Sequence, residues 1–426
     1  MFGLSAEWLL DGGELIPSAV VLSHPEQLAR LVRACPQAAD VVIMAGDPCF
    51  DRMLASHPLR ASYRRALGAH AGQRLVVVSS TWGASSLFGR HRDLVPRLTA
   101  SLPVDEYRVV LALHPNIWSW HSPWQVRMWL ADCGRAGVVV LPPEEGWRAA
   151  LVAADLVIGD HGSVTFYGAA LGHPVLLASA PEDAVDPRSP VGRLLTAAPR
   201  LDSTGDLAGQ VARAITTHDR AQLDSITALA TSAPGESARL LRRALYRMLD
   251  LSEPATPADV VAVPMPSNTV PPDTGCVLGS HLVHVQLTHV TEGDVHAEIV
   301  RYPADLLRAA GPIPHQAHLV VDTAEPYRRW LELADIVVLP QPADALPTLA
   351  AMPGCLLATA PQDAHDWVVV LRDGRSARFR KVALDGRVCA SILHAWLTEG
   401  HELNALSGRV RVQLGATQGT MDVTTS

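Results

Sequence analysis

The stretch RLVVVSSTWG, residues 74–83, decides the fold class because it joins an apolar strand to a polar turn. The uninterrupted apolar run from Leu75 to Val78 is typical of a strand buried on both faces of a parallel sheet. Shorter apolar runs recur on either side of it and alternate with helical stretches, which is the pattern of β-α-β units. We therefore predict a Rossmann-like α/β domain with a parallel sheet over residues 36–250.

The other elements up to residue 250 follow from the same alternation. Further strands are predicted at residues 20–22, 41–45, 108–113, 137–141, 155–158 and 174–178. Helices are predicted at residues 25–33, 53–67, 87–98, 124–134, 146–153, 164–171, 207–217 and 235–249.

Composition excludes several classes of function. The chain has 426 residues, 48% of them hydrophobic, and a formal net charge of −8. This length accommodates two or three domains. The acidic balance argues against a nucleic-acid-binding surface, which needs clustered cations. The six cysteines are scattered and form no CxxC pair, so neither a metal site nor a cofactor is predicted.

The sequence also gives no sign of a membrane or secretory segment. The start lacks the basic region of a signal peptide. No apolar run reaches the roughly 20 residues of a membrane-spanning helix. We therefore expect a cytoplasmic protein without a transmembrane segment.

Changes in composition suggest the domain boundaries. Residues 1–45 are interpreted as the remnant or end of an N-terminal Rossmann half, and residues 46–251 as the nucleotide-donor-binding domain. Prolines crowd the stretch 252–274, which predicts a linker. A second, smaller, degenerate Rossmann-like α/β region is expected at 275–407, followed by a flexible tail at 408–426 that is rich in small polar residues.

The two α/β regions share an internal similarity. LLASAPEDA at 176–184 matches LLATAPQDA at 356–364, and ADLV at 154–157 matches ADIV at 334–337. Both pairs are offset by 180 positions, since 356 − 176 = 180 and 334 − 154 = 180. Chance matches in a chain rich in Ala, Leu and Val are the alternative to duplication.

Duplication makes a structural prediction. Residues 318–365 should repeat the β-α-β-α-β unit of residues 137–185, with the strand at 318–321 taking the place of the strand at 137–141. In the second copy, LPQPADA replaces the segment GDHGSVT of the first. Because the glycines and hydroxyls are gone, the second copy should lack a phosphate site.

Polar segments follow three predicted strands, where open parallel sheets bind their ligands. They are Ser80-Thr81, His114, and the run from Asp160 to Thr165. Gly162 and Ser163 should lie at a helix N-terminus, which favours an anion. Each segment also has a purely structural explanation as a cap, a turn or a core histidine. Their recurrence at successive strand ends favours binding.

Four motifs together resemble the donor-binding domain of GT-B glycosyltransferases. They are GDPCFD at 46–51, VVVSSTWG at 76–83, LALHPN at 111–116 and VIGDHGSVTFYGAALGHPVLL at 157–177. Their order and spacing are most similar to CDP-glycerol glycerophosphotransferase-like proteins, and UDP-N-acetylglucosamine 2-epimerases are similar over the same stretch. The resemblance implies that the following residues contact donor phosphates: Ser80, Thr81, His114, Gly162, Ser163 and Thr165. It also implies that Asp160 organises the turn.

Two departures from that family stand out. Phe166 and Tyr167 occupy the helix in which the relatives carry an acidic residue. Only about 40 residues precede the GDPCFD motif, whereas the family has a whole N-terminal Rossmann half there. A homo-oligomer, or a partner that supplies this half, is therefore also expected.

The resemblance implies a transferase that moves a sugar or a polyol-phosphate from a nucleotide-diphosphate donor. His114 and His161 are the candidate catalytic residues, and His24 is a further candidate base. Two alternatives stay open. One is a non-catalytic binding or scaffold protein, and the other is an epimerase-like enzyme that acts on a nucleotide sugar.

Overall fold

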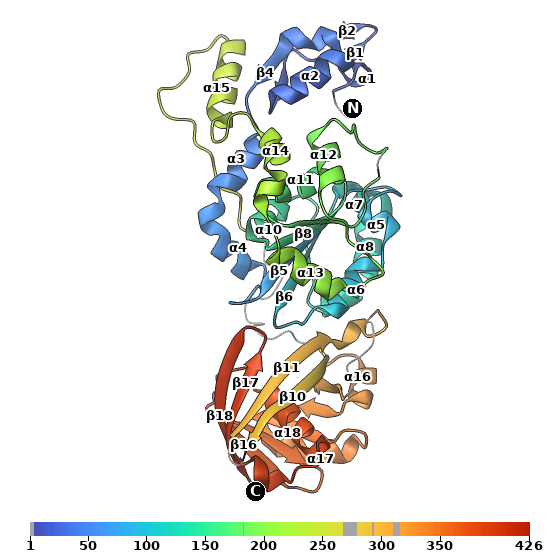
Figure 1. Cartoon of the computed structure of the whole chain (residues 1–426), viewed down its shortest axis with the longest axis vertical. Coiled ribbons are helices and arrows are strands. Elements are labelled where there is room, and N and C mark those ends of the chain that lie inside the picture. Colours follow the sequence, from blue (N-terminus) through green and yellow to red (C-terminus); the bar gives the residue numbers. More distant parts are fainter. Residues whose placement is uncertain (1–3, 182, 267–278, 292–293, 310–315) are drawn as a thin grey trace.

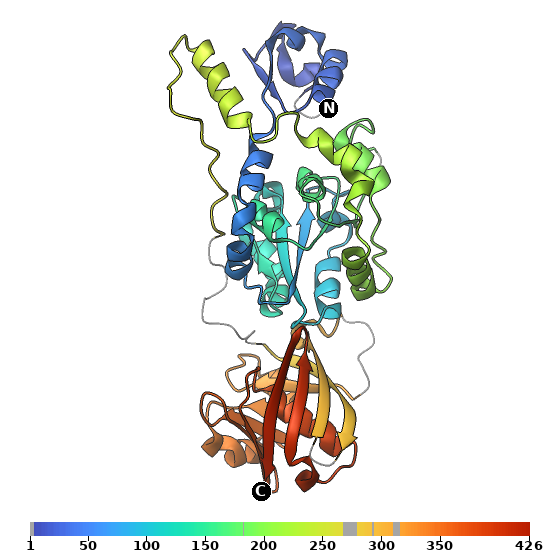
Figure 2. The ribbon, with the colours of Figure 1, turned by 60° about the vertical axis from the view of Figure 1, so that its left-hand side comes forward.

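The computed structural model describes residues 4–181, 183–266, 279–291, 294–309 and 316–426. Three parts follow one another along the long axis in Figures 1 and 2. We refer to residues 4–44 as the N-terminal module, to residues 46–251 as the central domain and to residues 279–426 as the barrel domain.

The N-terminal module is small and has its own core. Its elements are α1 (Ala6–Leu9), β1 (Leu10–Asp11), β2 (Glu14–Leu15), β3 (Val20–Leu22), α2 (Pro25–Ala34) and β4 (Val42–Met44). Strands β3 and β4 pair in parallel and form a sheet of two strands, apart from the central one. The strand predicted at 41–45 therefore belongs to this module, which corrects the start of the Rossmann-like domain from residue 36 to about residue 46.

The central domain contains the predicted parallel sheet. Its strands are β5 (Arg74–Ser80), β6 (Tyr107–Leu113), β7 (Val139–Val140), β8 (Leu156–Gly159) and β9 (Val175–Leu177). They pair in parallel in the order β7-β6-β5-β8-β9. Residues Leu75 to Val78 are completely buried because separate apolar clusters cover the two faces of β5. The prediction of a Rossmann-like α/β fold is confirmed.

Helices surround this sheet (Figure 1). They are α3 (Pro48–Ala55), α4 (Arg60–Ala66), α5 (Leu87–Arg90), α6 (Leu94–Ser101), α7 (Pro115–His121), α8 (Pro123–Trp129), α9 (Ala131–Arg135), α10 (Trp147–Ala153), α11 (Ser163–Ala170), α12 (Pro190–Ala197), α13 (Leu207–Thr216) and α14 (Asp224–Thr227). Helix α15 (Ser237–Met248) lies away from the sheet, beside the N-terminal module (Figure 1). The single helices predicted at 53–67, 87–98 and 124–134 are each interrupted. A 3-10 turn at His57–Leu59 that contains Pro58 separates α3 from α4.

The prolines after residue 252 form an irregular segment that partly docks on the central domain. Val263 is buried, its N–H donates to Ser56 Oγ at 2.8 Å, and its carbonyl accepts from the Tyr63 hydroxyl at 2.6 Å. Residues 267–274 of the predicted linker, like Cys276, lie outside the described residues.

The barrel domain is α/β, as predicted, but its sheet closes on itself. The strands are β10 (His281–Thr291), β11 (Asp294–Pro303), β12 (His318–Asp322), β13 (Ile336–Val338), β14 (Leu357–Pro361), β15 (Trp367–Leu371), β16 (Ser376–Arg380), β17 (Gly408–Leu414) and β18 (Thr417–Thr425). They form a closed barrel in the order β10-β11-β17-β18-β16-β15-β14-β13-β12. Its helices are α16 (Arg328–Leu333), α17 (Ala345–Ala351) and α18 (Val388–Thr398).

The prediction of a flexible tail at 408–426 is wrong. Strands β17 and β18 form a hairpin that completes the barrel between β11 and β16. Apolar residues alternate along both strands and point into the barrel core, among them Val410, Val412 and Met421. This period of two is the signature of a half-buried strand. Because the segment is rich in Gly, Thr and Ser, this alternation was not recognised in the sequence.

The internal similarity has a structural basis, but its predicted alignment is wrong in one strand. Asp155 N donates to Leu75 O, and Asp155 Oδ2 accepts from Leu75 N. Asp335 makes the same two bonds to Leu319. Strand β12 thus occupies the place of β5, which pairs with β8, whereas β7, with which it was aligned, is separated from β5 by β6. The predicted alignment used the strand that precedes β8 in the sequence, β7, instead of the strand that pairs with β8 in the sheet, β5.

Candidate functional site

The three polar strand ends lie side by side because β6, β5 and β8 are neighbours in the sheet. The His114 N–H donates to the Ser80 carbonyl at 3.0 Å, which joins the ends of β6 and β5. The Thr81 hydroxyl donates to Asp160 Oδ2 at 2.8 Å, which joins the ends of β5 and β8. The structure therefore brings together the residues that the sequence singled out.

Asp160 holds this arrangement in place. Its side chain is 1% exposed, and its Oδ2 accepts from Thr81 N at 2.9 Å and from Leu87 N at 2.9 Å. Its Oδ1 accepts from Gly162 N at 3.2 Å. A buried carboxylate whose oxygens already accept from this many donors is not available to a ligand. This geometry is that of a turn organiser.

The partners of His161 define its tautomer. Because the Thr81 hydroxyl gives its proton to Asp160, its oxygen is left to accept from His161 Nε2, which lies 3.4 Å away. The proton of a neutral ring is then on Nε2. Nδ1 is left as an acceptor, and it is buried without a hydrogen-bond partner among the described residues.

His114 has the same tautomer, but its bonded nitrogen is Nδ1 rather than Nε2. It caps the start of α7, where its Nδ1 accepts from Asn116 N at 3.1 Å. Burial lowers the pKa of His114, although the Asp160 carboxylate opposes this effect. The ring is therefore neutral near pH 7 with its proton on Nε2, so that His114 can donate where His161 can accept.

Two predicted phosphate contacts are buried too deeply for that role. Ser80 is 3% exposed, and its hydroxyl accepts from Phe88 N and donates to Thr81 O. Thr165 is completely buried against Gly159. Both residues shape the turn from inside the domain, which corrects the expectation that they touch a donor.

Gly162 and Ser163 lie at the start of α11, as predicted. Gly162 is the N-cap with an ordinary φ of −84°. A glycine is needed there because a Cβ would lie 2.6 Å from Thr81 Cγ2. Ser163 is exposed at the first helical position, where unpaired N–H groups favour an anion.

A cavity of about 770 Å³ opens in front of Ser163. Residues of α2 and of the loop after β4 line it from one side, and residues of α11, α12 and the loop before α12 line it from the other. The lining residues are Ser23, Gln27, Arg30, Asp47, Ser163, Phe166, Tyr167, Asp183, Ala184, Val185, Asp186, Ser189, Pro190, Val191, Leu229 and Ala230. Ser163 alone among the predicted site residues belongs to this lining.

Sequence reasoning missed the role of Tyr167. Its hydroxyl donates to Asp47 Oδ2 at 2.6 Å, and its ring lies between those of Phe50 and Trp147. Burial and the neighbouring Asp47 carboxylate raise the pKa of Tyr167. Asp47 also caps α3 through Cys49 N. Tyr167, which departs from the family pattern, is thus hydrogen-bonded to the aspartate of the GDPCFD motif, 120 positions earlier in the chain.

Arg30 is a cation of the cavity lining that was not predicted as a site residue. Its side chain is buried beside the cavity, and its Nη2 donates to Glu26 Oε2 at 3.1 Å one helical turn earlier. The carboxylates of Asp47, Asp183 and Asp186 also line the cavity. Among the described residues, no cluster of His, Cys, Asp and Glu side chains could hold a metal ion.

Comparisons with known proteins reveal partial structural similarity. No family model matches the sequence, and no curated protein matches it. The wall teichoic acid polymerase TagF is similar at 12% identity and a TM-score of 0.39, over 55% of this chain and 57% of that one. The UDP-GlcNAc 2-epimerase of Neisseria meningitidis, solved with UDP-GlcNAc, is similar at 13% identity and a TM-score of 0.35, over 54% and 61%.

HepE of Anabaena, solved with UDP and glucose, is similar at 16% identity and a TM-score of 0.31, over 55% of this chain and 64% of that one. The chain thus spans less than two thirds of each of these proteins. A wall teichoic acid polymerase and a UDP-GlcNAc 2-epimerase are both among its structural neighbours. The function of this chain is argued below from its own residues.

Proposed function

We propose that the central domain and the N-terminal module together bind a nucleotide-diphosphate donor, and that the protein transfers a sugar or a polyol-phosphate from it. The cavity in front of α11 carries this proposal. Its volume of about 770 Å³ is in the range of small-molecule sites. Its wall includes the exposed Ser163 at a helix N-terminus, a position that favours a diphosphate.

The geometry also suggests how a transfer would be assisted. The backbone N–H groups at the start of α11 would stabilise the negative charge that builds on the departing diphosphate. His161 Nδ1 would accept the proton of an attacking hydroxyl, because that nitrogen carries no proton. His114 would donate through Nε2. Because His161 Nδ1 is buried and neither histidine lines the cavity, both roles require the site to rearrange when a donor binds.

The test is a melting curve with and without CDP, UDP and GDP for the wild type and for Ser163→Asp. A ligand that prefers the native state must raise the melting midpoint. We expect at least one of the three nucleotides to raise the wild-type midpoint at millimolar concentration. The variant should lose this response because its carboxylate occupies the place of the diphosphate.

Ala131→Asp is the matched control. It places the same charge at the first position of α9, where the side chain is also exposed, away from the cavity. Its nucleotide response should equal that of the wild type. If no nucleotide shifts the wild-type midpoint, the donor site does not exist and a scaffold role takes its place. Product analysis with the nucleotide that binds then separates transfer from epimerisation.

A further inference from the structure

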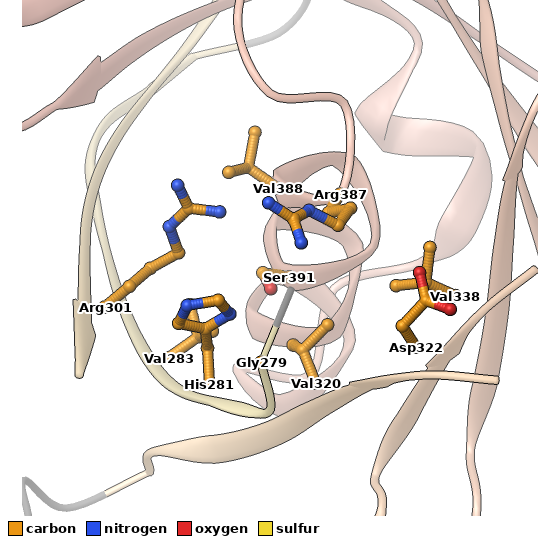
Figure 3. A pocket seen from close by; sticks show the side chains of 10 residues that line it. All are labelled: Gly279, His281, Val283, Arg301, Val320, Asp322, Val338, Arg387, Val388 and Ser391. Atoms are coloured by element: carbon orange, nitrogen blue, oxygen red, sulfur yellow. The ribbon is translucent and has the colours of Figure 1, made fainter. Parts of the chain in front are cut away.

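A second pocket lies in the barrel domain, at the end where α18 begins (Figure 3). Its free volume is about 10 Å³, which is enough for about one particle of the size of water. The lining residues are Gly279, His281, Val283, Arg301, Val320, Asp322, Val338, Arg387, Val388 and Ser391. Figure 3 shows Arg301, Arg387 and His281 grouped on one side of the pocket, with Ser391 of α18 next to them.

Two buried side chains present hydrogen-bonding groups to this pocket. Ser391 is 1% exposed, and its hydroxyl has no hydrogen-bond partner among the described residues. His281 is 4% exposed. A buried hydroxyl without a partner costs free energy, and because Ser391 lines a pocket, an atom or molecule bound there would satisfy it.

The arginines are fixed in orientation by two aspartates. Arg301 donates through Nε and Nη2 to Asp105, and through Nη1 to Asp385 at 2.6 Å. Arg387 donates through Nε and Nη2 to the same Asp385. These bonds use three of the five N–H groups of Arg301, which is itself 7% exposed. The pocket therefore contains more donors than acceptors.

The charges limit what the pocket can hold. The two aspartates neutralise the two arginines, so a multiply charged anion would not be compensated. Asp322 lines the pocket as well, but it lies apart from the arginines in Figure 3, and its Oδ1 accepts from Ala324 N. The ligand must be small, must accept hydrogen bonds and must carry at most one negative charge.

We propose that this pocket binds one monovalent anion of the size of chloride, held by Arg301, His281 and Ser391 at the start of α18. The dipole of the 11-residue helix α18, whose N-terminal end lies here, adds a favourable field for a negative charge. Because Arg301 also bonds to Asp105 of the central domain, the anion would strengthen the contact between the two domains. The site is separate from the donor cavity and does not depend on its function.

The experiment compares melting curves in sodium chloride and sodium gluconate at equal ionic strength. Gluconate is too large for the pocket and serves as the reference anion. We expect chloride to raise the wild-type midpoint in a saturable manner. Ser391→Ala should weaken the apparent chloride affinity about tenfold, since it removes one hydrogen bond to an ion.

Thr165→Val is the matched control because it removes another buried hydroxyl without a partner, in the central domain. Its chloride response should be that of the wild type. Crystals of the wild type soaked in bromide should show an anomalous peak between His281 and Ser391. Equal wild-type midpoints in both salts, an unchanged response in Ser391→Ala or a bromide-free pocket would each mean that the void holds only water, and would overturn the proposal. The bromide soak decides the matter if Ser391→Ala does not fold.

Discussion

At the residue scale, Gly162 shows why a glycine can matter without an unusual backbone angle. Its φ of −84° is available to any residue. The constraint is one of space, because a Cβ on this residue would lie only 2.6 Å from Thr81 Cγ2. Thr81 cannot withdraw freely, because both its N–H and its hydroxyl bond to Asp160. A change at Gly162 is therefore felt by the whole turn that carries the candidate site.

We predict that Gly162→Ala destabilises the protein by about 1–3 kcal/mol through overpacking against Thr81. Gly134→Ala is the control, since a Cβ at this helical position meets no atom within 4 Å. That variant should be neutral or slightly more stable, because alanine favours a helix over glycine. Chemical denaturation of both variants measures the difference. Equal midpoints would show that the turn can shift to accommodate a methyl group.

At the element scale, the C-terminal hairpin shows how an unpromising composition can still form core strands. Met421 and Val423 of β18 are 1% and 2% exposed and face α18 and the other strands of the barrel core. Gly415 has a φ of +54° in the two-residue turn that joins β17 to β18. Such turns require a residue that tolerates positive φ. The hairpin is thus specified by its turn and its alternation.

Met421→Ala is predicted to destabilise the barrel domain by about 2–5 kcal/mol, as expected for a large side chain removed from a core. Met128→Ala makes the same chemical change at a side chain that is 57% exposed. It should alter stability by less than about 0.5 kcal/mol. Urea unfolding followed by circular dichroism would compare the two. A Met421→Ala variant as stable as Met128→Ala would mean that β18 is not part of the core.

At the scale of the whole molecule, two histidines in different domains, the partly buried His173 and the buried His318, link stability to pH. Burial lowers the pKa of His173 in the central domain to about 4 and that of His318 in the barrel domain to about 3. Both stay neutral in the folded protein, whereas the unfolded chain binds protons near pH 6.5. Their contribution to stability is therefore complete above pH 6.5 and is lost as the pH falls from about 6.5 towards 3.

Each of these histidines should lower the free energy of unfolding by about 2 kcal/mol as the pH falls from 7 to 5. His318→Gln removes one titrating group, so its stability should fall less steeply over this range than that of the wild type. The readout is the denaturation midpoint measured at half-unit intervals from pH 7 to pH 5. Parallel pH profiles for the two proteins would show that His318 can be protonated in the folded state.

The sequence by itself determined the central sheet, the order of its elements and the three polar strand ends. Those features are local: an apolar run such as Leu75 to Val78 specifies a buried strand, and the polar residues that follow must lie at its carboxyl end. The position of Ser163 at a helix N-terminus was predictable for the same reason, whereas the organising role of Asp160 was implied by the resemblance to the GT-B donor domain.

Tertiary structure alone decided which of these residues face a cavity. Ser80 and Thr165 are buried by packing that no local pattern encodes, and Arg30 reaches the cavity from a separate module. The pairing of Tyr167 with Asp47 and the closure of the barrel by β17 and β18 join residues far apart in sequence. Such contacts depend on how complete elements pack together. Burial of apolar surface between segments far apart in the chain selects one packing arrangement, and this arrangement cannot be read from local sequence patterns.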